Sequence, residues 1–325
     1  MKKLLVFVET KGDEPRKATL ELLSETRRLS EAGSFAVTAV GLGKISERAI
    51  EKVLGYADSF VRITDALLDH YTPEGYSEAL AAYARQEDVL LILGAATQTA
   101  RDFLPRTAVL LEAGIASDVT AIGWADDPMT FVRPMYGGRV PAQCTFAGYP
   151  AVVSVRPNSY AVAPARERRG EYAEVAGCVS PDRIKTRVLR VEVESKGKVD
   201  LMEADSIVTG GRGMKGAENF ALLEELAAGL GGAVGATRSV VDAKWRDQDD
   251  QVGKSGKTVS PKLYIAAGLS GAIHHVMGMD TSGVILAINK DPNAIIFNYA
   301  NYGIVGDVME IVPAMTAELK KRTGR

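Results

Sequence analysis

The sequence predicts an α/β protein of two domains. Its 325 residues exceed what one hydrophobic core usually holds. In both halves, apolar strand-like runs alternate with segments of helical periodicity, which is typical of a parallel sheet covered on both faces. A short stretch rich in Lys and Gly at residues 196–200 separates the halves. We therefore expect an N-terminal parallel-sheet α/β domain at residues 1–195 and a C-terminal ligand-binding α/β domain at residues 196–325.

The first half opens with a continuous apolar run at residues 4–8, which predicts a buried strand. Residues 17–32 follow with leucines at helical spacing, and Gly33 ends this predicted helix. The same alternation continues to residue 112. It predicts strands at 35–40, 59–63 and 89–93, and helices at 46–54, 76–85 and 101–112.

Between residues 124 and 195 the pattern changes to short strands separated by Pro- and Gly-rich turns. Strands are predicted at 130–134, 151–155 and 188–194. The last of these alternates apolar with charged residues, which indicates a half-exposed strand. Our interpretation is the end of the first sheet followed by a connector, with a hinge at residues 196–200.

The second half opens with a strand at 206–209, a glycine-rich turn and a helix at 217–230. The turn contains the G-x-G-x-x-G pattern at Gly211, Gly213 and Gly216, but no acidic residue ends a clear second strand about twenty residues later. Arg212 inside the turn suits a phosphate or a flavin. The remaining predicted elements are strands at 239–241, 263–267 and 284–288 and a helix at 313–321.

Composition excludes several classes of partner and compartment. Lys and Arg number 39 against 41 Asp and Glu, so neither nucleic acid nor an anionic membrane surface is an expected partner. No apolar run is long enough to span a bilayer, and the N-terminus has no signal-peptide pattern. The two cysteines, Cys144 and Cys178, lack metal-ligand spacing and suit a reduced cytoplasm, where we expect the protein.

The strongest functional signal is a pair of loops around the strand at 263–267. Residues 251–259 read QVGKSGKTV, and residues 268–275 read GLSGAIHH. Glycines let main-chain N–H groups approach a phosphate or a ring, hydroxyls and amides supply directed hydrogen bonds, and lysines balance negative charge. We expect the two loops to form one binding site.

Three other chemistries are weaker. His274 and His275 are adjacent, so on a helix their side chains point about 100° apart and cannot share one metal ion. The acidic residues at 247–250 are read as a solvated loop in preference to a magnesium site. The G-x-S-x-A pattern at 268–272 lacks the last glycine of a nucleophile elbow and has no evident base partner, which argues against a hydrolase.

Taken together, the motifs of the second half resemble the alpha subunit of electron transfer flavoproteins in order and spacing. They are GGRG at 210–213, GATR at 235–238, VVDAKW at 240–245, QVGKSGKTVSPKLYIAAGLSGAIHH at 251–275, INKDPNAIIF at 288–297 and NYGIVGD at 301–307. The first half agrees with this family more loosely, as an α/β domain.

The resemblance implies an FAD held mainly by the second domain and completed by a beta subunit in a heterodimer. Such a protein accepts electrons from a donor dehydrogenase and passes them to an acceptor oxidoreductase, commonly a quinone-reducing flavoprotein. By the same resemblance, Arg238 would lie against the isoalloxazine ring, Ser255 would bond flavin N5, and His275 would approach the O2 edge. Cations or donors near that edge favour the reduced flavin, because reduction places charge on N1 and O2.

The resemblance also implies roles for the rest of the motif residues. Arg212 and Thr237 would serve other parts of FAD, and Asn289 and Asp307 its adenosine. The two loops would wrap the ring, the ribityl chain and the pyrophosphate through Gln251, Val252, Gly253, Lys254 and Ser255 and through Ser270, Gly271, Ala272, Ile273, His274 and His275. Four positions depart from the usual pattern of the family: Thr237, Lys254, Ser255 and Asn301. Lys254, where Gln is common, adds a cation near the ring.

Two alternatives stay open at this point. An electron-bifurcating form would oxidise NADH with a second FAD in the beta subunit. A self-sufficient nucleotide-dependent oxidoreductase would bind NAD at residues 211–216 and turn over without a partner. The flavin content of the heterodimer separates the first alternative from the simple carrier, for which one FAD plus AMP is expected.

Overall fold

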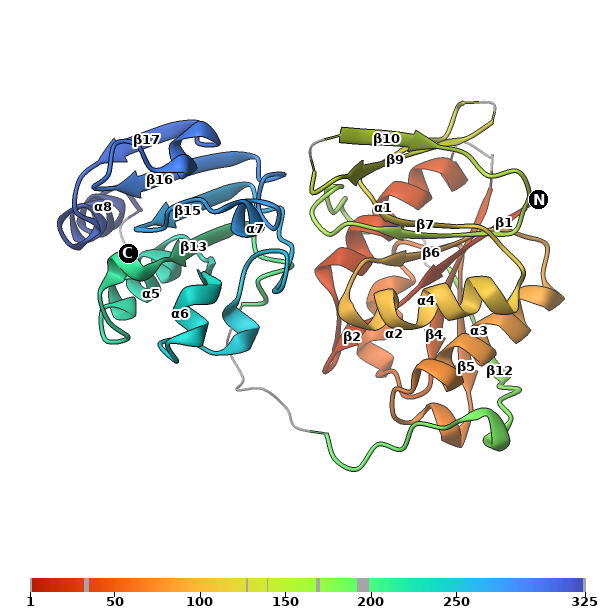
Figure 1. Cartoon of the computed structure of the whole chain (residues 1–325). Helices are drawn as coiled ribbons and strands as arrows, with labels where there is room; N and C mark the ends of the chain where they lie inside the picture. Colours follow the sequence, from red (N-terminus) through yellow and green to blue (C-terminus); the bar gives the residue numbers. More distant parts are fainter. Residues whose placement is uncertain are drawn as a thin grey trace. The chain divides into compact units, whose positions relative to one another are not determined.

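The computed structural model describes residues 2–31, 35–126, 128–138, 140–167, 170–191 and 199–323 (Figure 1). The chain divides into two compact units, residues 1–193 and 194–325. Most of the hinge predicted at 196–200 lies outside the described residues. Each unit has its own sheet and its own buried core.

The first unit is built on a seven-stranded sheet in the order β12-β5-β4-β1-β6-β11-β7, and all of its described strand pairs are parallel. The strands are β1 (Lys3–Phe7), β4 (Ala36–Leu42), β5 (Ser59–Thr64), β6 (Val89–Ala95), β7 (Ile115–Val119), β11 (Ala151–Val155) and β12 (Glu171–Ala176). The chain extends from β1 to one side and then returns to β6 on the other. The switch point of the topology therefore lies between β1 and β6.

Helices cover both faces of this sheet, as the apolar strands predicted. Leu4 and Val6 of β1 enter a core shared with α1 (Lys17–Glu31) and α2 (Glu47–Val53). Leu5 and Phe7 of the same strand enter the opposite core, shared with α3 (Pro73–Gln86) and α4 (Gln98–Leu110). Successive side chains of β1 thus pack alternately into the cores on the two faces of the sheet.

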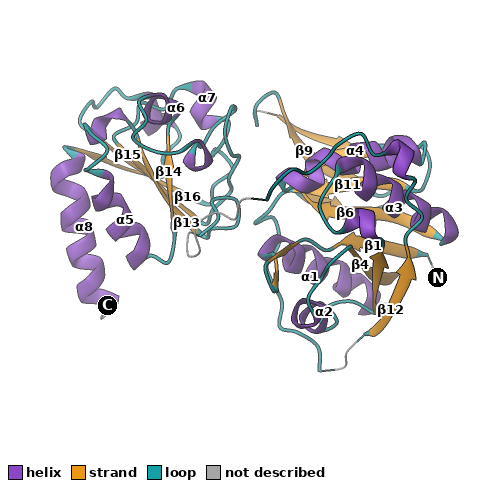
Figure 2. Cartoon of the chain, turned by 90° about the horizontal axis from the view of Figure 1, so that it is seen from below, coloured by secondary structure: helices purple, strands orange, loops and turns teal. Residues whose placement is uncertain are grey.

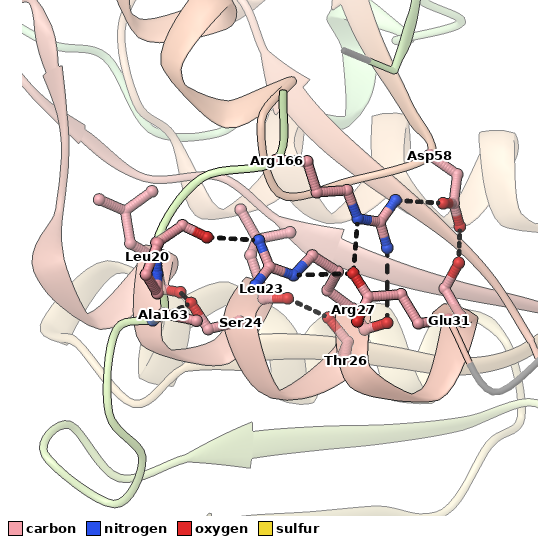
Figure 3. A network of polar contacts seen from close by, with 11 residues as sticks. Leu20, Leu23, Ser24, Thr26, Arg27, Glu31, Asp58, Ala163 and Arg166 are labelled. Atoms are coloured by element: carbon pink, nitrogen blue, oxygen red, sulfur yellow. Dashed lines mark hydrogen bonds and ion pairs between the residues drawn. The ribbon is translucent and has the colours of Figure 1, made fainter. Parts of the chain in front are cut away.

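The segment after β11 is fastened to α1 by a polar network (Figure 3). The Arg166 guanidinium donates to Asp58 Oδ1 at 2.9 Å and to Glu31 Oε1 at 3.0 Å, and Ala163 N donates to Ser24 Oγ at 3.0 Å. Burial alone would raise the pKa of Asp58, but hydrogen bonds from Ser30, the Val37 N–H and Arg166 lower it. This network guides the chain to the sheet edge, where β12 pairs with β5.

The region from 124 to 195 differs from the predicted end of the sheet. Strands β8 (Ala121–Gly123), β9 (Thr130–Met135) and β10 (Val140–Cys144) form a separate antiparallel sheet, whereas β11 inserts between β6 and β7. The prediction of a strand at 188–194 is wrong for its described part. Residues 188–191 pair with no described strand, and their side chains are largely exposed, so alternation alone did not suffice.

The second unit has a five-stranded parallel sheet in the order β14-β13-β15-β16-β17. Its strands are β13 (Ser206–Gly210), β14 (Ala233–Ala236), β15 (Leu263–Ala267), β16 (Val284–Asn289) and β17 (Tyr302–Val305). Helices α5 (Phe220–Gly229) and α8 (Val308–Thr323) lie side by side on one face (Figures 1 and 2). The other face is covered by the segment around Val252 and Val259, by Met279 and by Ile296.

The strand predicted at 239–241 is wrong. Those residues belong to α6 (Arg238–Asp242), and the strand is β14, four residues of Ala, Val and Gly just before it. A run of three residues is too short for periodicity to separate strand from helix. The apolar Val240 side chain is buried against the face that α5 and α8 cover, which a helix achieves as well as a strand. None of the described helices combines the length and apolar character needed to cross a bilayer.

Candidate functional site

The residues predicted to bind a ligand gather at one edge of the second sheet. Each of its five parallel strands delivers at least one of them at its carboxyl end, where open α/β sheets bind ligands. These residues are Arg212 after β13, Thr237 and Arg238 after β14, Ser270 to His275 after β15, Asn289 at the end of β16 and Asp307 after β17. The loop 251–255 joins the same edge, because Gln251 bridges Ala236 at the end of β14.

The glycine-rich turn after β13 packs against the turn after β15. Gly213 N donates to Gly268 O at 2.9 Å, and Gly211 N donates to Ala267 O at 3.0 Å. A Cβ on Gly213 would lie 2.7 Å from Gly268 Cα, and a Cβ on Gly211 would lie 2.4 Å from Gly268 O. The first two glycines of the G-x-G-x-x-G pattern therefore allow the two loops to meet each other, which argues against their use as a dinucleotide fingerprint.

The loop 251–257 is closed by hydrogen bonds of its own. Lys257 N donates to Gln251 O at 2.7 Å, Gly253 N donates to Lys257 O at 3.1 Å, and Gln251 Nε2 donates to Ser255 Oγ at 2.9 Å. Gly253 has φ +137°, a backbone conformation that residues other than glycine rarely adopt. Gln251, Val252 and Gly253 are buried, whereas the side chains of Lys254 and Ser255 are exposed at the turn.

The loop after β15 presents a row of main-chain donors. Among the described residues, the N–H groups of residues 270–274 donate to no main-chain carbonyl. They precede or begin the short helix α7 (Ile273–Val276), and Ser270, Ala272 and His274 are exposed beside them. The turn depends on Gly271, whose φ is +79° and whose missing Cβ would lie 2.4 Å from Ile296 N. Consecutive unpaired N–H groups are suited to bind an anion such as a pyrophosphate.

The two histidines of α7 have different surroundings. His274 is exposed, whereas His275 is 7% exposed, with Nδ1 at 3.1 Å from Val252 O and Nε2 at 2.9 Å from Tyr264 Oη. Burial lowers the pKa of His275 to about 4 and raises the pKa of Tyr264. The His275 ring is thus neutral near pH 7, and both of its nitrogens are engaged by protein atoms.

The cations of the site are close to solvent. Arg212 and Lys254 are exposed, and Arg238 has a side chain that is 71% exposed and lies 3.5 Å from Asp242. Arg238 is the first residue of α6, and not the start of a strand as its sequence context predicted. Thr237, at the helix N-cap, shares a 3.1 Å hydrogen bond with Ser239.

Asn289 and Asp307 lie where β16 and β17 end. Asn289 Nδ2 donates to Leu269 O at 2.9 Å, so this side chain ties β16 to the loop after β15. Asp307 accepts from Met309 N at 3.0 Å and from Lys215 Nζ at 2.9 Å. The Met309 N–H and then Lys215 lower the pKa of the Asp307 carboxyl.

The described residues include no cluster of His, Cys, Asp and Glu suited to a metal ion. In the acidic loop 247–250, Asp250 is paired with Arg246 at 2.8 Å. What the edge offers is hydroxyls, exposed cations, unpaired N–H groups and close main-chain turns. This donor set fits a ligand that carries a pyrophosphate and a polar ring, as FAD does.

Two residues that bond the predicted site residues were not anticipated from the sequence. Tyr264 bonds the ring of His275, and Lys215 pairs with Asp307. A single hydroxyl within the otherwise apolar strand 263–267 was the available signal for Tyr264. Lys215 gave no signal, because its partner lies 92 residues away.

The chain is similar to proteins of one family over nearly its whole length. Residues 4–179 match the family model of the electron transfer flavoprotein domain, and residues 200–280 match that of the electron transfer flavoprotein FAD-binding domain. The chain is 39% identical to the electron transfer flavoprotein subunit alpha of Thermoanaerobacterium thermosaccharolyticum over 98% of both chains. It is 37% identical to that of Bacillus subtilis, again over 98% of both. It is also 38% identical to protein FixB of Azotobacter vinelandii over 98% of this chain and 91% of the relative.

Proposed function

The chain belongs to the electron transfer flavoprotein alpha-subunit family, and from that premise we propose how it carries electrons. It binds FAD, and the proposed site is the carboxyl edge of the second sheet. The alpha subunits of this family pair with a beta subunit. We propose that the heterodimer takes electrons from a donor dehydrogenase and delivers them to an acceptor oxidoreductase, in a reducing compartment such as the cytoplasm. The free Cys144 and Cys178 support that compartment.

The observation that carries this proposal is the row of N–H groups at residues 270–274, which have no main-chain partner among the described residues and lie near exposed cations. These N–H groups would bind the pyrophosphate. When bound, FAD would supply the redox chemistry, because a flavin ring can exchange electrons one or two at a time. Arg238 and Lys254 would add positive charge near the ring, and the Ser255 hydroxyl would donate to it.

The other proposed contacts follow the remaining loops of the edge. Arg212 and Thr237 would flank the ligand from β13 and β14, and Asn289 and Asp307 would bind its adenosine from β16 and β17. The main chain would contribute at Gln251, Val252, Gly253, Gly271, Ala272, Ile273, His274 and His275, and Ser270 would add a hydroxyl. This set comes from five strands, so a correctly folded sheet edge is a condition for binding.

The test removes two cations from the edge and compares the result with a matched pair elsewhere. We expect Arg212→Ala/Lys254→Ala, expressed with the beta subunit, to raise the FAD dissociation constant about tenfold, the size expected for charge-assisted hydrogen bonds. Lys262→Ala/Lys321→Ala removes the same charge from the start of β15 and from α8, and should leave the constant unchanged. Equal FAD binding in both variants would place the cofactor elsewhere.

The flavin content of the purified heterodimer tests the redox role. We expect one FAD per heterodimer. Two would indicate a bifurcating protein. A chain that binds FAD stoichiometrically and turns over without the beta subunit would contradict the proposed heterodimer.

A further inference from the structure

A buried chain of three residues connects β15 to the loop 251–257 of the proposed FAD site. Tyr264, on β15, has no exposed surface, and its hydroxyl lies 2.9 Å from His275 Nε2. The second ring nitrogen of His275, Nδ1, lies 3.1 Å from Val252 O in the loop 251–257. Strand, helix and loop are thus linked through one imidazole.

The partners of the ring fix where its proton resides. A carbonyl oxygen only accepts hydrogen bonds, so Nδ1 carries the proton and donates to Val252 O. Nε2 is then an acceptor, and the Tyr264 hydroxyl donates to it. In a doubly protonated ring, Nε2 would also carry a proton, and the Tyr264 hydroxyl could no longer donate to it. The hydroxyl proton would then need another acceptor in a site with almost no access to water. The arrangement selects one neutral tautomer.

His275 holds Val252, and Val252 lies just before the exposed turn at Lys254 and Ser255. Next to it, Lys254 N donates to His274 O at 2.7 Å, so α7 holds the loop on both sides of Gly253. The main chains meet too closely for side chains at this point, since a Cβ on Gly278 would lie 2.4 Å from Gly253 Cα. Ser255, two residues beyond Gly253, is exposed at the tip of the same turn.

We propose that Tyr264 is a positioning residue of the FAD site, which acts through His275 to hold the loop 251–255 against α7. In this arrangement the His275 ring holds the loop through Val252, and both of its nitrogens are engaged by protein atoms. The resemblance implied that this ring approaches O2 of the flavin. The oxygen O2 is an acceptor and needs a donor, whereas Nε2 is already an acceptor from Tyr264. The inference rests on the proposed site.

The first experiment needs no substitution and reads the proton directly. The chain has only three histidines, His70, His274 and His275, so nitrogen NMR of a heterodimer in which this chain alone is histidine-labelled can be assigned with His70→Gln and His274→Gln. We expect His275 to show a protonated Nδ1 and an unprotonated Nε2, with and without FAD. A protonated Nε2 in the FAD-loaded protein would overturn the inference, and it would assign the ring to the flavin.

The second experiment removes the hydroxyl. Tyr264→Phe removes the hydrogen bond to His275 Nε2 but leaves Nδ1 donating to Val252 O, so it should shift the nitrogen resonance of Nε2 without changing the tautomer. It should also raise the FAD dissociation constant about three- to tenfold, the equivalent of one net hydrogen bond. Tyr83→Phe is the matched control, because Tyr83 is a buried tyrosine of the other unit, on α3. It should change neither reading. Unchanged FAD binding and an unchanged Nε2 resonance in Tyr264→Phe would contradict the positioning role, while a wild-type heterodimer without FAD would contradict the proposed function itself.

Discussion

The two parallel sheets of this chain treat their carboxyl edges in opposite ways. In the first unit, Glu9 follows β1 and bonds residues that follow β6. Its carboxylate accepts from Thr97 Oγ1, from Thr99 Oγ1 at 3.2 Å and from Arg16 Nε at 3.0 Å. In the second unit, the corresponding edge keeps N–H groups at residues 270–274 without main-chain partners among the described residues.

This difference shows that a parallel sheet does not by itself provide a ligand site at its carboxyl edge. Both sheets are parallel, and parallel sheets bind ligands at a switch point of this kind. In the first unit the chain's own carboxylate lies at the N-terminus of α4, the place an anion would take. The carboxylate thus occupies the switch point of the first sheet, whereas the N–H groups at residues 270–274 of the second unit have no main-chain partner among the described residues. The same fold class is therefore a poor guide to which unit binds FAD.

The largest expected effect comes from filling the turn that presents the free N–H groups. Gly271→Ala would place a Cβ 2.4 Å from Ile296 N at a φ of +79°. We expect about 3 kcal/mol or more of lost stability, from strain and displaced main chain together, and loss of FAD. Denaturant unfolding and flavin content of the heterodimer measure both.

Gly231→Ala is the control for that substitution. Gly231 has φ +63° and nothing within 4 Å of an added Cβ, so only the conformational cost of about 1 kcal/mol should appear. Equal losses in the two variants would show that close approach at Gly271 is unimportant.

Acid should destabilise the second unit before the first. The pKa of His275 is lowered from 6.5 to about 4 in the fold, so the unfolded chain binds the extra proton between these values. Stability is complete above about pH 6.5 and falls by about 3 kcal/mol as the pH drops to 4. In the first unit, burial alone would raise the pKa of Asp118, but Arg156 and Arg101 lower it, so its contribution is lost only below about pH 4.

Urea unfolding of the heterodimer at several pH values, followed by flavin release, measures this difference. His275→Gln should remove the slope between pH 6.5 and 4. A slope that persists in this variant would assign the acid sensitivity to another group.

A smaller effect is expected at the carboxyl edge of the first sheet. Glu9→Gln keeps the size of the side chain but removes the charge from its hydrogen bonds, and should cost about 2 kcal/mol of stability. FAD content should stay at one per heterodimer, because Glu9 belongs to the other sheet. Loss of FAD from a folded Glu9→Gln heterodimer would break the comparison between the two edges.

The smallest effect concerns the exposed Arg238. Its removal should make the bound flavin harder to reduce, since a positive charge near the ring stabilises the reduced form. With a side chain 71% exposed, solvent screening limits the change to about 1 kcal/mol or less. Potentiometric titration of Arg238→Ala measures it, with Lys262→Ala as the distant exposed control. Equal midpoint potentials in both variants would show that the Arg238 charge does not act on the flavin ring.

The sequence alone determined the alternating α/β pattern and the motif residues that indicate FAD. Strands such as β1, β6 and β15 are continuous apolar runs, and local hydrophobicity suffices to find them. It did not identify β14 or place β12, because a short Ala- and Gly-containing strand and an exposed edge strand have no strong local signal. Those strands form by pairing with neighbouring strands, β14 with β13 and β12 with β5.

The tertiary structure alone decided how the two signature loops meet. One precedes β15 and the other follows it, so an extended connection would place them at opposite ends of that strand. Residues 251–257 instead return to the carboxyl edge, where Gln251 bridges Ala236 and Val252 accepts from His275. Tyr264 completes this link from inside the core. Such contacts join residues that are distant along the chain, and their free energy appears only when the sheet brings them together.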